Sequence, residues 1–300
     1  MKPAIKAQGY LILMTAVWGM TFPLLHRAIV TITPQQLVFQ RFLLASLLLL
    51  PFVVKSLKKT DGLILIGGLI LGLLNCGTYL FQTIGLETIS ASRAAFITGA
   101  SVLFVPFLSP LFGLGKPKTI DFVSALICLF GLTILTGANL AAVTVGDIWV
   151  LGCAICVALT ILTIQWLTQR MKHYLLLTFY QLLLTVPIAA LFVHENYFTW
   201  QWRPEVWFTI FFCALFATVI ALFIQIRFQH YTTATKAALI FTLEPVFASI
   251  FDWVLNGERL TLIAMIGGFF ILLSIILPEL FRHIKTCFFC TCPADRVISD

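Results

Sequence analysis

Charged residues are scarce in this chain: Asp, Glu, Lys and Arg make up 10% of its 300 residues, and 60% are hydrophobic. A soluble domain carries roughly 25% charged residues, so a soluble fold of this composition would lack the polar surface needed to cover itself. No GxxxxGK[ST] phosphate-binding motif occurs, which excludes an ATP-driven pump unless a partner supplies the ATPase. A nucleophile elbow and a metal-binding constellation are also missing, so we expect no enzyme, no metal and no cofactor.

Long charge-free runs dominate the sequence instead. A membrane-spanning helix needs about 20 mostly apolar residues, and eight runs between consecutive charged residues are long enough to hold one. Two further stretches qualify if an internal charge is tolerated: 35–54 contains Arg41, and 236–256 contains Glu244 and Asp252. We therefore predict an all-α integral membrane protein with ten spans, at 8–30, 35–54, 62–85, 93–114, 120–138, 146–167, 174–193, 205–226, 236–256 and 261–280.

The placement of basic residues favours one orientation. With the N-terminus inside, fourteen Lys and Arg residues fall in inner segments and four in outer loops, while Arg41 lies within a span. Because cytoplasmic loops carry an excess of Lys and Arg, we expect both termini in the cytoplasm. The net charge of +7 then faces anionic headgroups. We therefore expect membrane lipids, and no nucleic acid, as partners.

Two segments from different halves of the chain are similar to each other. Residues 78–104 align with 221–247 at six identical positions, and a small-polar run before a basic residue, Arg93 or Lys236, occurs in both. A repeat unit of five spans is odd, so its two copies must have opposite orientations, as in many secondary transporters.

The repeat predicts the organisation of the whole chain. We expect two inverted five-helix repeats around a central cavity, the first over residues 1–140 and the second over 141–281. A short cytoplasmic tail over 282–300 follows, with Cys287, Cys290 and Cys292.

Several motifs carry a family resemblance over roughly residues 8–280. They are AVWGMTF (16–22), the P-x6-R element from Pro34 to Arg41, TISASRAAFITGASVLFVP (88–106), TTATKAALIFTLEPVFASI (232–250) and NGERLTLIAMIGGFFIL (256–272). The chain resembles the EamA-like ten-span group of the drug/metabolite transporter superfamily. One departure is Gly115, which aligns with Glu258 in the register of the internal repeat, whereas many members keep a Glu in both copies.

The resemblance implies a function and a location. It implies a bacterial inner-membrane transporter with a central cavity that moves a small metabolite, such as an amino acid, a nucleobase or a nucleoside-like compound, by alternating access. A non-transporting receptor or assembly protein, and a membrane enzyme acting on lipid-linked substrates, remain alternatives. Monomer and homodimer are both open.

Charges inside a span cost roughly 2.5–3.5 kcal/mol each on insertion scales, so Arg41, Glu244 and Asp252 are the candidates for coupling or for a buried ion pair. Glu244 would contact a cationic group of the substrate or carry a proton. Pro245 follows it and frees a backbone carbonyl. The candidate substrate-binding residues are Trp18, Gln40, Arg41, Asn75, Tyr79, Thr98, Tyr180, Gln181, Gln225 and Glu244, and Gln165 is a further polar candidate.

Glycines inside the spans are expected to serve packing rather than binding. Gly67, Gly68 and Gly72 share one predicted span, and Gly267 and Gly268 share another. Small residues let helix backbones approach closely within a membrane. We therefore expect tight helix crossings at both places.

Overall fold

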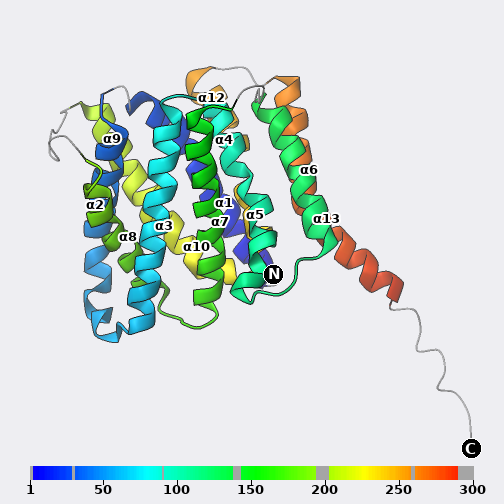
Figure 1. Ribbon diagram of the computed structural model, residues 1–300, viewed down its shortest axis with the longest axis horizontal. Coiled ribbons are helices and arrows are strands. Elements are labelled where there is room, and N and C mark those ends of the chain that lie inside the picture. The colour runs from blue at the N-terminus through cyan, green and yellow to red at the C-terminus, as the bar shows by residue number, and fades with distance from the viewer. Residues whose placement is uncertain are drawn as a thin grey trace, which may run out of the picture.

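The computed structural model describes residues 3–28, 31–89, 91–137, 143–193, 203–257 and 261–289. Within these ranges the chain forms helices and no strand (Figure 1). The helices are α1 (Pro3–Ala28), α2 (Pro34–Val53), η1 (Val54–Lys59), α3 (Gly62–Leu86), α4 (Ala91–Gly99), α5 (Ser101–Leu108), η2 (Ser109–Phe112), α6 (Thr119–Thr136), α7 (Val145–Thr168), α8 (Tyr174–Ala190), α9 (Pro204–Ala214), η3 (Leu215–Ile220), α10 (Ala221–Phe228), η4 (Gln229–Tyr231), α11 (Ala234–Phe241), α12 (Glu244–Asn256) and α13 (Leu262–Phe289).

The predicted all-α membrane fold is confirmed. In the described part of the chain, nine helical segments are long and apolar enough to cross a membrane. The remaining predicted span, 174–193, corresponds to α8, which is apolar but only 17 residues long. The expected count of ten spans therefore depends on including this shorter helix.

Polar residues and glycine set several of the helix ends. The Thr33 side chain accepts a hydrogen bond from the Gln36 backbone in a capping box that starts α2, and the Asp61 side chain caps α3 by accepting from the Ile64 backbone N–H. Gly137 and Gly257 end α6 and α12 with φ of +58° and +73°, a left-handed conformation that glycine adopts without steric cost. These local signals place the loops between the spans.

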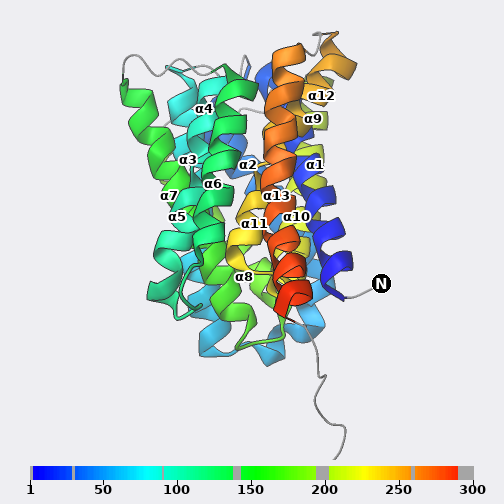
Figure 2. The same cartoon turned by 90° about the vertical axis from the view of Figure 1, so that its right-hand side faces the viewer.

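Two of the predicted spans are interrupted near their middle. One consists of α4 and α5, which are separated at Ala100, and the other of α11 and α12, which are separated at Thr242 and Leu243. The alignment of 78–104 with 221–247 puts Ala100 on Leu243, so the two breaks occupy equivalent positions of the sequence repeat. Figure 2 shows α4 above α5 but α11 below α12, so the two broken spans run in opposite directions.

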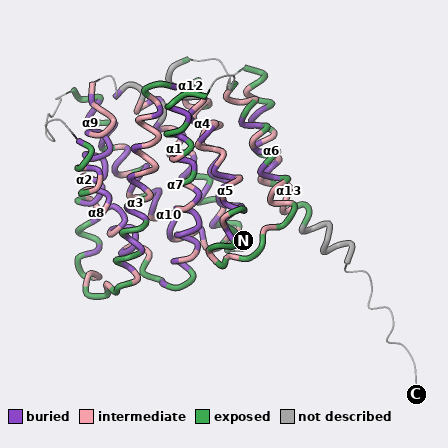
Figure 3. The backbone as a smooth tube through the Cα atoms, in the orientation of Figure 1, coloured by how far each residue is buried: buried purple, intermediate pink, exposed green. Residues whose placement is uncertain are grey.

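Buried residues lie on the inward faces of the helices, and exposed ones lie on the outward faces and at the ends (Figure 3). Many outward residues are large and apolar; Phe52 and Leu191, for example, are 73% and 77% exposed. Such a surface is unfavourable in water but suits contact with lipid tails. The exposure pattern therefore agrees with a membrane-spanning chain.

Close helix crossings occur at the predicted glycines. A Cβ on Gly68 would lie 2.5 Å from the Cβ of Tyr180 in α8, and Gly72 faces the backbone around Gln181. Gly267 of α13 faces the backbone of α6 at Gly131. These contacts confirm the predicted packing role of both glycine groups, and Tyr180 and Gln181 lie at one of the crossings.

Candidate functional site

A cavity of about 320 Å³ lies among α1, α2, α3, α4, α7, α10, α11 and α12. It therefore borders helices from both halves of the chain. Its lining is divided about evenly between apolar and polar side chains, and the two charged ones are Arg41 and Glu244. Seven of the predicted candidates line it: Trp18, Arg41, Asn75, Tyr79, Thr98, Gln225 and Glu244.

The other neutral candidates do not line this cavity. The Tyr180 hydroxyl is 3.1 Å from the Thr60 hydroxyl. Gln40 and Gln181 are buried, and the Nε2 atom of each has no hydrogen-bond partner. Gln165 belongs to a hydrogen-bonded cluster at one end of the cavity. The structure thus separates these residues from the group around Glu244.

Arg41 is held by η3, a segment of π-helix between α9 and α10. Its Nε donates to the Thr218 hydroxyl at 2.6 Å, and its Nη2 donates to the Ala217 carbonyl at 3.1 Å and to the Tyr79 hydroxyl at 3.3 Å. The Trp18 indole also donates to the Ala217 carbonyl, at 2.9 Å. Short π-helical segments expose such carbonyls and are frequent at functional sites.

The expected buried ion pair does not form between Arg41 and Glu244. Among the described side chains no carboxylate lies within salt-bridge distance of Arg41, which is satisfied by neutral acceptors instead. The side chain of Asp252, the other proposed partner, lies outside the described part of the structure, as do those of Cys287, Cys290 and Cys292.

Glu244 occupies the break between α11 and α12. It is the first residue of α12, and Pro245 in the next position lacks the backbone N–H that would continue the helix. Its carboxylate has no hydrogen-bond partner among the described residues and borders the cavity. A carboxylate in this position is available to a ligand.

Two further polar groups on the lining have no partner. The Asn75 side chain is 4% exposed and that of Thr160 is 7% exposed, and neither the Asn75 Nδ2 nor the Thr160 Oγ1 makes a hydrogen bond. An unpaired buried polar group costs about 1–3 kcal/mol. Ligand acceptors that reach these donors would offset that cost.

Sequence reasoning missed part of the lining. The polar residues that it omitted are Thr21, Thr78, Gln82, Thr83 and Thr160. Gln82 had a usable signal, because it aligns with the candidate Gln225 in the internal repeat. The threonines had none, since a threonine within an apolar span can as well bond its own helix.

Buried glutamines form a hydrogen-bonded cluster next to the cavity. Gln225 donates to the Oε1 of Gln229 at 3.2 Å, and Gln229 donates to the Ile161 carbonyl at 2.7 Å and to the Oε1 of Gln165 at 3.3 Å. Gln165 in turn donates to the Thr232 carbonyl at 3.1 Å. This cluster joins α7 to α10 and η4, and Gln225 connects it to the cavity lining.

Apolar residues line the opposite end of the cavity. Leu25, Leu37 and Leu86 come from the end of α1, the start of α2 and the end of α3, and Ile89 follows α3. The two ends therefore differ: one is joined by side-chain hydrogen bonds and the other is lined by hydrocarbon.

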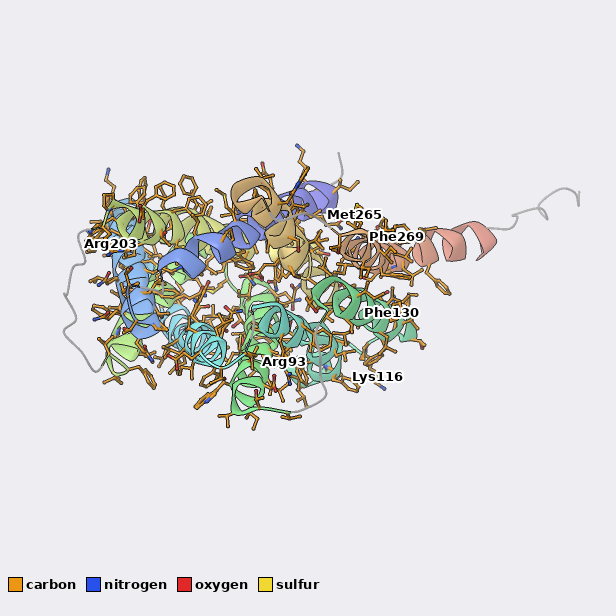
Figure 4. All side chains as sticks on the ribbon, turned by 90° about the horizontal axis from the view of Figure 1, so that it is seen from above. Arg93, Lys116, Phe130, Arg203, Met265 and Phe269 are labelled. Atoms are coloured by element: carbon orange, nitrogen blue, oxygen red, sulfur yellow. The ribbon has the colours of Figure 1, made fainter. Side chains whose placement is uncertain are left out.

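Ion pairs hold the starts of the two broken spans. Near the start of α4, Arg93 donates from Nε and Nη2 to the two carboxylate oxygens of Asp147 in α7, at 2.5 and 2.6 Å. Near the start of α11, the Lys236 Nζ lies 2.5 Å from a carboxylate oxygen of Glu279 in α13. Figure 4 shows Arg93 beside α4 and α7, whereas Arg203 and Lys116 lie at the periphery. Arg93 and Lys236 thus anchor equivalent positions of the two halves.

Apolar helices around a cavity with polar and charged groups on its wall define a multi-pass membrane protein of the transporter class. The model of the EamA-like transporter family matches residues 5–137 and again residues 144–278. The chain belongs to this family of membrane transporters, which confirms the resemblance found in its motifs.

Similar proteins agree with this assignment. An uncharacterized transporter of Archaeoglobus fulgidus is 31% identical over 270 residues, which cover 90% of this chain and 84% of that protein. YdfC of Bacillus subtilis, also described as an uncharacterized transporter, is 25% identical over 262 residues, which cover 85% of each. A solved structure titled "Crystal structure of protein" shares the fold, with a TM-score of 0.75, 16% identity and coverage of 94% of this chain and 98% of that chain.

Proposed function

We propose that the protein is a secondary transporter that moves a small metabolite across the bacterial inner membrane by alternating access. The observation that carries this proposal is the cavity bordered by both helix breaks, because Glu244 and Thr98 reach it from equivalent regions of the two halves. Broken helices of this kind form the substrate sites of many secondary transporters.

The lining defines the chemistry of the substrate. An unpartnered carboxylate at Glu244 favours a cationic or hydrogen-bond-donating group, while Asn75 and Thr160 offer donors to an acceptor group. Trp18 and Tyr79 present aromatic surface on which a planar or cationic solute can stack. A volume of about 320 Å³ is near the lower end of the roughly 300–1,000 Å³ of ligand pockets. An amino acid, a nucleobase or a nucleoside-like compound meets these requirements.

In this proposal the two ends of the cavity open in turn, one to each side of the membrane. With both termini in the cytoplasm, as the basic residues predict, the glutamine cluster of Gln165, Gln225 and Gln229 would lie on the cytoplasmic side, which supports a state closed to the cytoplasm. Passage to the cytoplasm requires the cluster to separate while the apolar end closes. Inverted repeats over 1–140 and 141–281 supply two halves that exchange these conformations.

Ligand binding to the purified protein tests this function. A ligand that binds the native state must raise its stability, so thermal unfolding is measured against amino acids, nucleosides and S-adenosyl compounds. We expect one chemical class to raise the midpoint of the wild type and of Glu87→Gln, which changes an exposed carboxylate at the end of α3. Thr160→Trp fills the cavity and should lose the response. Equal stabilisation of Thr160→Trp, or no response to any compound, would contradict the proposal.

A further inference from the structure

A second, smaller pocket lies where the two helix breaks meet. Its volume is about 30 Å³. A buried water needs roughly 10–15 Å³ of such space, so this pocket holds one or two particles of that size and excludes a metabolite. It is lined by Gln82, Ala95, Thr98, Gly99, Phe241, Thr242, Glu244 and Pro245.

The two halves contribute equivalent residues to this pocket. The internal repeat pairs Thr98 with Phe241 and Gly99 with Thr242, and all four line the pocket. Gly99 is the last residue of α4 and Phe241 the last of α11. The pocket therefore lies between the C-terminal ends of two half-helices.

Negative and positive ends of half-helices meet at the pocket, because α5 and α12 begin where α4 and α11 end, and the Glu244 carboxylate makes the net potential negative. Each helix C-terminus carries partial negative charge on its unpaired carbonyls, and Glu244 adds a carboxylate. The Phe241 carbonyl lacks its normal helical donor, because the residue four positions later is Pro245, which has no N–H. The lining of this pocket contains no basic residue, and Arg41, the charged neighbour of Glu244 on the larger cavity, is hydrogen-bonded to η3 rather than to the carboxylate.

The oxygen atoms that line the pocket indicate which class of ligand it can bind. The Thr98 hydroxyl, the Glu244 carboxylate and backbone carbonyls are all oxygen ligands, and Gln82 donates its amide N–H to Thr98, which leaves its own Oε1 as an acceptor. Calcium sites use several carboxylates, whereas this pocket has one. In the described part of the chain, no group of three or more His, Cys, Asp and Glu side chains offers a site for a transition metal. One carboxylate among neutral oxygens matches a single positive charge.

We propose that this pocket, formed by Glu244 and the facing ends of α4 and α11, binds a monovalent alkali cation such as Na⁺. Glu244 also borders the larger cavity, so one carboxylate serves both sites. A consequence rests on the proposed transport function: the bound cation neutralises the charge that a cationic substrate would meet. Such a substrate binds more weakly when the pocket is loaded, as exchange of the two across the membrane requires.

Thermal unfolding of the purified full-length protein in detergent tests the site without any metabolite. The midpoint is compared in NaCl, KCl and choline chloride at equal ionic strength. A cation at about ten times its dissociation constant should raise the wild-type midpoint by roughly 3–6 °C over choline. Equal midpoints in all three salts would overturn the proposal.

Variants assign the response to the pocket. Glu244→Gln keeps the shape but removes the charge, and should lose the alkali-cation response, whereas Glu87→Gln removes an exposed carboxylate and should keep it. Thr98→Val retains the charge and should raise the half-saturating cation concentration several-fold, which keeps the test open if Glu244→Gln does not fold. A full response in Glu244→Gln, or an unchanged concentration in Thr98→Val, refutes the site. Because no metabolite is present, this failure would leave the transport function untouched.

Discussion

The crossing of α6 and α13 allows a sharp test with two neighbouring glycines. A Cβ on Gly267 would lie 2.6 Å from the Gly131 carbonyl oxygen and 2.8 Å from the Leu135 Cα, both backbone atoms of α6. Rotation of a side chain cannot relieve these contacts, so the two helices would have to separate. A Cβ on Gly268 would meet only a Val246 methyl group, at an ordinary 3.7 Å.

The expected free energies of unfolding differ in sign. Overpacking costs typically 1–3 kcal/mol, while replacing glycine by alanine inside a helix gains about 1 kcal/mol. Gly267→Ala should therefore destabilise the protein by about 1–2 kcal/mol. Gly268→Ala, with the same chemical change one residue away, should be neutral or stabilise it by up to about 1 kcal/mol.

Thermal unfolding of both variants in one detergent at one protein concentration measures this difference. The two variants differ by about 1–3 kcal/mol, so at about 2–4 °C per kcal/mol the midpoint of Gly267→Ala should be roughly 2–12 °C below that of Gly268→Ala. Equal midpoints, or a more stable Gly267→Ala, would show that α6 and α13 do not cross at Gly267.

Three further substitutions test the contacts around the cavity. Arg41→Lys keeps the charge but cannot reach both acceptors on η3, so unfolding should cost about 1.5–3 kcal/mol less; wild-type stability would contradict the contacts assigned to Arg41. Trp18→Phe removes the donor to the Ala217 carbonyl and should lower the free energy of unfolding by about 0.5–1.5 kcal/mol, and a larger ligand-induced shift in this variant would argue against Trp18 as a cavity wall. Asp147→Asn breaks the two-point pair with Arg93 and should cost about 1–3 kcal/mol at low salt, whereas no loss would mean that the pair is energetically silent.

Hydropathy and motifs predict the architecture because lipid imposes long apolar helices. The placement of charges identified the two spans that carry Arg41 and Glu244, and both residues line the cavity. Pro245 gave a usable signal for the break before α12, since the missing N–H is a property of the residue itself. Pro106 gave no such signal for the other break, because it lies inside α5, beyond Ala100.

The hydrogen-bond partners of Arg41 could not be predicted from the sequence. The charge pattern predicted a carboxylate partner, whereas the structure supplies a backbone carbonyl from a π-helical segment. The residue types around Ala217 give no sequence signal for the π-helical turn at 215–220. The residues of the cavity wall could not be predicted either, because they depend on how each helix is rotated about its axis. Asn75 lines the cavity, while Gln40 and Gln181 do not.

Substrate counterflow tests the central claim most directly. Liposomes that contain the purified protein and an excess of the unlabelled ligand found by the stability screen are diluted into the labelled ligand. The wild type and Glu87→Gln should accumulate label transiently against its gradient, while Glu244→Gln should reduce the initial rate at least about tenfold, which corresponds to about 1.4 kcal/mol. Accumulation no faster than in protein-free liposomes, or full activity in both Glu244→Gln and Thr160→Trp, would contradict a transport path through this cavity.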